Sequence, residues 1–346
     1  MKRPSHILVI RLSAMGDVAI TVPVITHLLK TYPDLKVTVL TKPFFAHLFS
    51  HLDRVNIVKA EVKLKHKGIS GLWVLAKQLH RLDIDSVADL HNVLRSRILC
   101  GFMKILGHDY YRIDKGRRDK RALTRSQNKV LKPLKPTHRR YADVFKKLNL
   151  PLDSGFTIEK RPLDLSERIK SRPDLDTSKK WIGIAPFAAH SPKQYPIKLM
   201  KKVISELARQ GDIQVLLFGG GKKEIKKLNS LASDVNSCYC VAGEFSFPEE
   251  LKLISNLKVM LSMDSGNGHL AAMFGVDVIT LWGATHPYAG FAPYGQREEL
   301  QLLPDLKKYP LLPTSIYGNK KVKAYKKVME DIKPEDVIEA VKQVTN

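Results

Sequence analysis

Two junctions between an apolar run and a helical pattern carry residues suited to anion binding and proton transfer. In the first half, the run Ile7–Leu12 leads into Ser13-Ala14-Met15-Gly16-Asp17. In the second half, Lys258–Ser262 leads into Met263-Asp264-Ser265-Gly266-Asn267-Gly268-His269. The N-terminus of a helix offers free backbone N–H groups and the positive end of the helix dipole, so the second junction favours an anionic ligand such as a phosphate.

The second junction has two interpretations. Gly266 and Gly268 would let a phosphate approach the backbone, and Ser265 or Asn267 could cap the helix or bond the ligand. Alternatively, the stretch is a well-capped tight turn without a ligand. It also matches the dinucleotide pattern G-x-G-x-x-A, but that pattern opens a first βαβ unit and is followed by an acid about 20 residues later. Position 286 is a histidine, so a nicotinamide or flavin site has little support.

Three further features allow more than one interpretation. Asp17 could simply cap the next helix, or it could act in catalysis, since ligands of open α/β sheets bind beyond the carboxyl ends of the strands. Gly219-Gly220-Gly221-Lys222 lacks the spacing of a phosphate loop and indicates a glycine-rich turn. Glu224 could bond a ribose hydroxyl or be a solvated first-turn acid. The histidines and the three cysteines show no zinc-binding spacing.

Alternating strands and helices must position these residues. The pattern predicts two α/β halves with parallel sheets, joined by a polar linker at Asp164–Lys180. We expect an N-terminal domain over 1–165 and a C-terminal domain over 178–325, with a final helix at 334–346 able to pack back on the first. The predicted strands are Ile7–Leu12, Lys36–Leu40, Val55–Val58, Ile84–Leu90, Trp181–Ala185, Ile213–Phe218, Cys238–Val241, Lys258–Ser262 and Val276–Leu281.

Composition limits the class of protein. The 346 residues are 44% apolar and 27% charged, which excludes a disordered chain, a collagen-like fibre and a disulfide scaffold. The net charge is +24, and Arg112–Lys147 alone holds 14 Lys or Arg against three acids. Such a balance favours polyanionic partners: nucleic acid, an anionic membrane or a phosphorylated substrate. The apolar stretch His6–Leu29 is interrupted by Arg11 and Asp17, so we expect neither a membrane span nor a signal peptide.

Taken together, the motifs resemble glycosyltransferase family 9, the heptosyltransferases. The matching segments run in family order from about residue 6 to 295. Tyr195 replaces the usual Trp of the donor segment, and His91 replaces a usual Gln. The segments are Ile7–Asp17 with its S-x-x-G-D turn, Asp89–Ser96, Thr137–Tyr141, Ile184–Pro196, Asp264–Ala272 and Gly283–Pro287.

The resemblance implies a GT-B fold, with two facing Rossmann-like domains and the active site between them. It implies an inverting, metal-independent transfer of a sugar from a nucleotide-diphosphate donor, namely heptose from ADP-heptose. It implies no cofactor. Asp17 would be the general base, and Lys193 would neutralise the departing diphosphate. Phe245 could stack on the nucleobase or belong to the core, and Asp264 could orient the turn or bond the sugar. The implied donor-binding set is Gly16, Ala188, Ala189, Glu224, Phe245, Asp264, Ser265, Gly266, Asn267 and His269.

The implied acceptor is lipopolysaccharide core or a related anionic glycolipid, which basic side chains of the first half would bind. The implied location is the cytoplasm, at the inner face of the cytoplasmic membrane. The expected acceptor-binding residues are Lys63, Lys65, Arg95, Arg117, Arg118, Lys120 and Arg121. A solvated basic loop is the alternative for this segment.

Two other classes of protein stay open at this point. One is a nucleic-acid-binding α/β protein, although the chain has no RNP strand, helix-turn-helix signature or zinc finger. The other is a GT-B scaffold that has lost activity. Ala188, Ala189 and Asn267 depart from common family residues, and this puts both the sugar and the activity in question.

Overall fold

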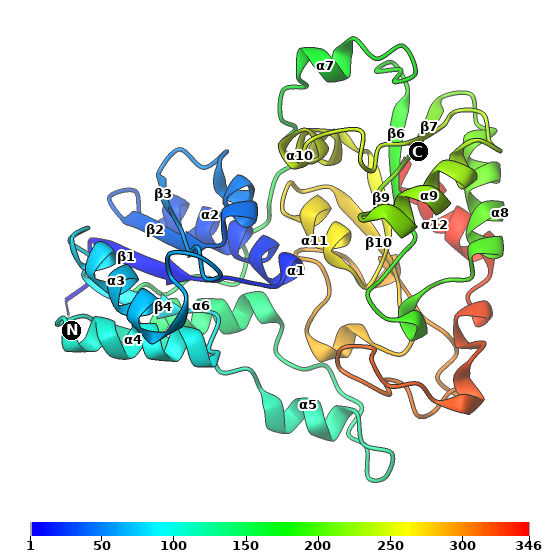
Figure 1. Cartoon of the computed structure of the whole chain (residues 1–346). Coiled ribbons are helices and arrows are strands. Elements are labelled where there is room, and N and C mark those ends of the chain that lie inside the picture. Colours follow the sequence, from blue (N-terminus) through cyan, green and yellow to red (C-terminus); the bar gives the residue numbers. More distant parts are fainter. Residues whose placement is uncertain (1, 346) are drawn as a thin grey trace. The chain divides into compact units, whose positions relative to one another are not determined.

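The computed structural model describes residues 2–345, which form two compact units (Figure 1). Unit 1 comprises Met1–Lys115 and Pro136–Thr157, and unit 2 comprises Gly116–Lys135 and Ile158–Asn346. Each unit contains its own parallel sheet, so each can bury a core by itself.

Unit 1 contains a five-stranded parallel sheet in the order β3-β2-β1-β4-β5. Helices α3 and α4 contact each other over one face of the sheet, and α2 contacts α6 over the other. Its strands are β1 (His6–Ile10), β2 (Lys36–Thr41), β3 (Val55–Lys59), β4 (Ser86–Asp89) and β5 (Asp109–Arg112). Its helices are α1 (Met15–Ala19), α2 (Thr21–Thr31), the 3-10 helix η1 (Pro43–Phe49), α3 (Gly68–His80), α4 (Leu94–Ile105) and α6 (Thr137–Lys147).

Unit 2 contains a six-stranded parallel sheet in the order β11-β10-β9-β6-β7-β8. Its strands are β6 (Lys180–Ala185), β7 (Ile213–Leu217), β8 (Cys238–Cys240), β9 (Val259–Met263), β10 (Asp277–Leu281) and β11 (Gln301–Leu302). Its α-helices are α5 (Arg117–Leu123), α7 (Glu167–Lys170), α8 (Ile197–Ala208), α9 (Lys222–Ala232), α10 (Phe247–Asn256), α11 (Gly266–Ala272) and α12 (Pro334–Thr345). Its 3-10 helices are η2 (Ser191–Lys193), η3 (Pro287–Ala289), η4 (Glu298–Leu300), η5 (Lys323–Tyr325) and η6 (Val328–Asp331).

The predicted α/β alternation with parallel sheets is confirmed, and the structure adds details that periodicity did not show. The expected single helix after the first strand is two helices, α1 and α2, with a break at Ile20. Pro23 lies in the first turn of α2 and has no N–H to continue the ladder of α1, which explains the break. Strands β5 and β11 and helix α5 were not expected, because each is short and lacks a clear period.

The structure divides the chain differently from the expected domain boundaries at two places. Residues 116–135, expected in the first half, belong to unit 2, where Leu123 and Leu134 pack with Ala289. The Leu134 N–H also donates to the Tyr288 carbonyl at 2.9 Å. The final helix α12 contacts α8 and buries its apolar stripe in the core of unit 2.

Candidate active site

In unit 1, Asp17 lies beyond the carboxyl end of β1 and is paired with Arg11. One Arg11 amine donates to the Leu90 carbonyl at 2.6 Å, and the other forms an ion pair with the Asp17 carboxylate. Arg11 is 6% exposed, whereas the Asp17 side chain is 29% exposed. The buried guanidinium thus holds the carboxylate in one orientation and leaves part of it open to a ligand.

The backbone around Asp17 is held as well. The Ala14 N–H lies 3.4 Å from the Asp17 carboxylate, so the capping interpretation is partly confirmed. The hydroxyl of buried Tyr141, on α6, donates to the Asp17 carbonyl at 3.2 Å. Arg11 and Tyr141 were part of the sequence motifs, but sequence reasoning gave neither a role. The sequence signal that could have indicated a role for Arg11 is its position as the one charged residue at the end of the apolar run Ile7–Leu12.

His91 lies in the same cluster and is neutral at physiological pH. Burial and the nearby Arg11 charge lower the pKa of His91 to about 3. Its backbone N–H donates to the fully buried Asp89 carboxylate, which also accepts from Asn92 N–H and the Ser96 hydroxyl. The Asp89–Ser96 segment therefore uses its acid to shape the turn before α4 and presents a neutral imidazole to the edge of the sheet.

The expected acceptor-binding residues are divided between the units. Arg95 is exposed on α4, and Lys63 and Lys65 are exposed in the loop before α3, all in unit 1. Arg117, Arg118, Lys120 and Arg121 lie on α5, which belongs to unit 2. The structure thus does not gather this set on one surface of unit 1.

In unit 2, Lys193 and Asp264 form a largely buried ion pair. The Lys193 ammonium donates to the Asp264 carboxylate at 3.1 Å and to the Asp264 carbonyl at 2.6 Å. The Thr285 hydroxyl donates to the same carboxylate oxygen at 2.8 Å. The two charged side chains are 11% and 12% exposed, so this pair is screened less than a surface pair. Asp264 therefore positions the Lys193 cation, a role that sequence reasoning had not given it.

Gly318 completes the surroundings of Lys193. Its φ is +75°, and a Cβ at this position would collide with the aliphatic stem of Lys193. The Thr314 N–H donates to the Ala284 carbonyl at 3.0 Å, and the Ala284 N–H donates to the Pro192 carbonyl at 3.0 Å. The segment 312–318 thus lies against the turn that carries Lys193.

Helix α11 begins directly after Asp264, with Ser265 as its N-cap residue. Ser265, Gly266 and Asn267 are half-buried, and His269 is 8% exposed. The Ser265 hydroxyl is buried and makes no hydrogen bond within residues 2–345. A buried polar atom without a partner at a helix start suits a site that a ligand completes.

Gly268 has a packing role that the sequence did not show. A Cβ on Gly268 would lie 2.6 Å from the Ser262 hydroxyl and 3.2 Å from Val278. We therefore expect Gly268→Ala to lower the free energy of unfolding by about 1–3 kcal/mol, because α11 must move off the sheet. Thermal or urea unfolding measures this change.

Gly101→Ala is the matched control for that experiment. Gly101 lies inside α4, and apart from the backbone of its own helix no atom lies within 4 Å of the place that a Cβ would take. The added methyl should raise stability by about 0.4–1 kcal/mol by restricting the unfolded chain. Equal stability changes at the two glycines would contradict the packing role of Gly268.

The remaining expected donor residues of unit 2 lie in its loops. Ala188 is buried in the core, Ala189 is exposed, and the Gln194 amide donates to the Ala188 carbonyl at 2.6 Å. The Glu224 carboxylate accepts the Gly220 N–H at 2.9 Å, so it folds back on the glycine turn. This carboxylate therefore helps to hold its own loop.

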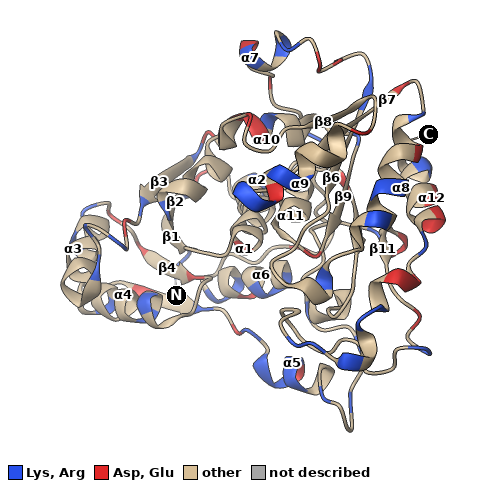
Figure 2. Cartoon of the chain, turned by 45° about the vertical axis from the view of Figure 1, so that its right-hand side comes forward, with Lys and Arg blue, Asp and Glu red and all other residues tan. Residues whose placement is uncertain are grey.

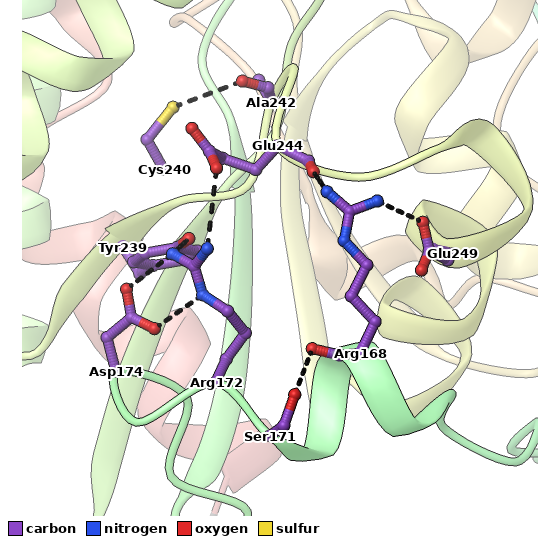
Figure 3. Close-up of polar contacts among 9 residues, drawn as sticks. All are labelled: Arg168, Ser171, Arg172, Asp174, Tyr239, Cys240, Ala242, Glu244 and Glu249. Carbon is purple, nitrogen blue, oxygen red and sulfur yellow. Dashed lines mark hydrogen bonds and ion pairs between the residues drawn. The ribbon is translucent and has the colours of Figure 1, made fainter.

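Phe245 is 7% exposed and lies beneath Arg168, whose guanidinium carbon is 5.5 Å from the ring centroid. Figure 3 shows how arginines hold the loop that contains it: Arg168 donates to the Glu244 carbonyl at 2.6 Å and to Glu249 at 3.4 Å. Arg172 forms a two-point ion pair with Asp174 at 2.9–3.0 Å. The core interpretation of Phe245 thus describes its burial in this structure.

Metal-binding clusters and membrane-spanning helices are both absent from the described part of the chain. Within residues 2–345, no group of three or more His, Cys, Asp or Glu side chains could hold a metal ion. No helix in this range is both long and apolar enough to cross a membrane.

Two Rossmann-like parallel-sheet units place the protein in the class of GT-B folds. A family model described as glycosyltransferase family 9 (heptosyltransferase) matches residues 72–316, and the chain belongs to this family. The chain is 24% identical over 305 residues to the lipopolysaccharide core heptosyltransferase OpsX of Haemophilus influenzae, covering 86% of this chain and 84% of that protein.

Solved structures share the fold. A family 9 glycosyltransferase from Veillonella parvula superposes with a TM-score of 0.73 at 20% identity, covering 98% of this chain and 97% of the other. The E. coli heptosyltransferase WaaC with ADP gives a TM-score of 0.67 at 16% identity, covering 98% and 99%. The resemblance found in the sequence motifs, the fold class and the assignment as a glycosyltransferase are therefore confirmed.

Proposed function

We propose that this enzyme is an inverting, metal-independent glycosyltransferase that moves heptose from ADP-heptose onto lipopolysaccharide core or a related anionic glycolipid. The observation that carries the proposal is the Lys193–Asp264–Thr285 arrangement at the start of α11, which holds a cation beside backbone N–H groups. The curated relative OpsX is named as a lipopolysaccharide core heptosyltransferase, and WaaC was solved with ADP. Both names support this donor and acceptor.

On the donor side, the reaction must stabilise the diphosphate that leaves the sugar. Lys193 supplies a positive charge that Asp264 and Thr285 keep in place, so little reorganisation is needed when negative charge develops. The N–H groups of Ser265, Gly266 and Asn267 and the Ser265 hydroxyl would hold phosphate oxygens. His269 would donate to a further phosphate oxygen. Lys193 would thus do the work that a divalent cation performs in other transferases.

On the acceptor side, a hydroxyl must lose its proton as it attacks the anomeric carbon. Asp17 is the proposed base, held by Arg11 and partly exposed. A carboxylate is a weak base, with a reference pKa of about 3.9 for aspartate. This is sufficient if the proton moves late, when the anomeric carbon already has oxocarbenium character.

A ligand screen tests the donor class directly. Thermal unfolding with ADP, UDP, GDP or CMP should show the largest stabilisation with ADP. At 100 times the Kd, the ligand adds about 2.7 kcal/mol to the free energy of unfolding. No shift with any nucleotide would favour an inactive scaffold. Nucleic acid retained by nuclease-treated protein would favour the nucleic-acid-binding alternative.

The proposed location is the inner face of the cytoplasmic membrane, reached through electrostatic attraction. Lys and Arg dominate α5 (Figure 2), and each basic residue near an anionic leaflet contributes about 1 kcal/mol. Changing Arg117, Arg118, Lys120 and Arg121 to Gln should therefore weaken binding to anionic vesicles and raise the KM for acceptor. Vesicle co-sedimentation and initial-rate kinetics measure both effects.

The same variant should leave donor affinity unchanged. From the sequence alone, we would have expected this because the basic segment and the donor site lie in different domains. In the structure, however, α5 belongs to unit 2, so the reason must be its contacts there. Its Lys120 lies over the Phe291 ring at 4.1 Å and Leu123 packs on Ala289, and none of these residues belongs to the proposed donor set. The control with the same charge change replaces Lys198, Lys202, Lys223 and Lys226, all exposed on α8 and α9. Equal vesicle binding by both variants would show that only net charge matters.

A further inference from the structure

Unit 2 contains a cavity of about 540 Å³ that includes none of the proposed donor-binding residues. Its floor is apolar and buried, formed by Ala284, Leu312, Val328 and Met329. This volume falls within the range of about 300–1,000 Å³ that small-molecule sites occupy, and such sites are mostly apolar.

The walls of the cavity come from an irregular segment that the fold holds firmly. The short helices η5 and η6 supply Tyr325, Val328 and Met329. The Tyr325 hydroxyl accepts the Leu311 N–H at 2.9 Å, and its ring packs edge-on against Tyr309. The Thr314 hydroxyl lies 3.4 Å from the Ala284 carbonyl. The Gln194 amide, which also lines the cavity, donates to the Ala188 carbonyl at 2.6 Å, so both polar side chains already have a partner within the protein, which disfavours a polar ligand there.

The rim of the cavity is strongly basic. Lys320, Lys321, Lys323 and Lys326 line it and are all exposed, and Glu330 is the only acid among the lining residues. A neighbouring groove of about 550 Å³ shares Thr314, Lys320 and Val322 with the cavity and adds Arg121 and Arg125. An apolar interior with a cationic mouth complements a molecule with an apolar chain and an anionic head.

We infer that this cavity binds one acyl chain of an anionic phospholipid, with the head-group phosphate held by the rim lysines. The inference deepens the membrane association proposed above and rests on it. A nucleotide fits less well, because a base would need hydrogen-bond partners that the floor does not offer. Electrostatic attraction of basic side chains to an anionic membrane surface would not require a cavity. The lipid chain would dock unit 2 at the leaflet through a specific site in addition to the charge of α5.

Dodecyl phosphate below its micelle concentration is the probe for the cavity. Isothermal titration should show one site per chain. Three control compounds should each bind at least tenfold more weakly than the probe. Octyl phosphate has a shorter chain, dodecyl maltoside has no charge, and inorganic phosphate has no chain. Phosphatidylcholine vesicles containing phosphatidylglycerol should compete with the probe, and pure phosphatidylcholine vesicles should not.

Variants separate the chain site from the charge of the rim. Val322→Trp fills the half-buried wall of the cavity without changing charge, and we expect it to weaken probe binding at least tenfold. Val322→Asp is a second variant, which places a negative charge in the cavity wall without adding a large side chain. The unfolding midpoints of both variants show whether they are folded. Lys320→Gln with Lys321→Gln should weaken binding at least fivefold. Lys198→Gln with Lys202→Gln, on α8, should have no effect.

Several results would overturn the inference. Probe affinity that Val322→Trp and Val322→Asp both leave unchanged in folded protein would show that no chain enters the cavity. Probe binding without competition from phosphatidylglycerol vesicles would indicate a soluble ligand instead of a membrane lipid. Failure of sugar transfer to a delipidated, soluble acceptor would overturn the proposed function alone, because probe binding does not depend on that reaction.

Discussion

Asp17→Asn should lower turnover about 10²–10⁴-fold while donor binding stays unchanged. Asparagine keeps the size of the side chain and can still accept a hydrogen bond from Arg11, but it cannot take a proton from an acceptor hydroxyl. Single-turnover transfer of labelled sugar measures the chemical step, and the thermal shift with ADP measures donor binding. The substitution leaves the buried Arg11 guanidinium without its ionic partner, so the unfolding midpoint should fall, and the rates are compared at a temperature where both proteins are folded.

Asp34→Asn is the matched control for Asp17. Asp34 is an exposed aspartate of unit 1, outside the Arg11 cluster. Its variant should transfer sugar at the wild-type rate. If Asp17→Asn stays within a factor of three of wild type, Asp17 is not the base, and the neutral His91 beside it becomes the next residue to test.

Lys193→Ala should impair transfer severely, and saturating EDTA should leave wild-type transfer unchanged. Both results follow if Lys193 takes the place of a metal ion in stabilising the leaving diphosphate. Lys193→Ala also leaves the largely buried Asp264 carboxylate without its cation, and breaking a buried pair costs about 3–5 kcal/mol. A loss of activity in this variant alone therefore has two explanations, catalysis and stability.

The double variant Lys193→Met with Asp264→Asn separates these explanations. It removes both charges, so the unfolding midpoint should recover most of what Lys193→Ala loses. Transfer should stay as low as in Lys193→Ala, because the diphosphate still lacks its cation. Recovered transfer in the double variant would mean that Lys193 serves only to neutralise Asp264. Activity abolished by EDTA and restored by Mg²⁺ would overturn metal independence.

The identity of the family could be derived from short, ordered motifs. Asp17 after the first strand and Asp264–Ala272 after β9 are contiguous in the chain, so their residue types and spacing were visible without a structure. The same holds for the parallel α/β alternation, because buried strands and amphipathic helices each leave a local period. The core interpretation of Phe245, kept open from sequence, describes its observed burial beneath Arg168. Glu224 was expected to bond a ribose or to be a solvated acid, but it is half-buried and accepts the Gly220 N–H.

The partners of the candidate catalytic residues could not be derived in this way. Arg11 reaches Leu90 across 79 residues, and Lys193 reaches Asp264 across 71, so no local pattern records either contact. The close packing of Gly268 on Ser262, in the strand beneath it, is likewise a contact that no local pattern records.

The sequence by itself determined the two α/β halves, the family and the position of Asp17 and Lys193 in its motifs, since these depend on neighbours along the chain. Only the tertiary structure decided that residues 116–135 and α12 belong to unit 2. Those choices depend on which core offers matching apolar surface: Ala289 for Leu123 and Leu134, and α8 for the stripe of α12. Charge density made the basic segment Arg112–Lys147 conspicuous in the sequence, but burial of Leu123 and Leu134 placed its central part, residues 116–135, in unit 2.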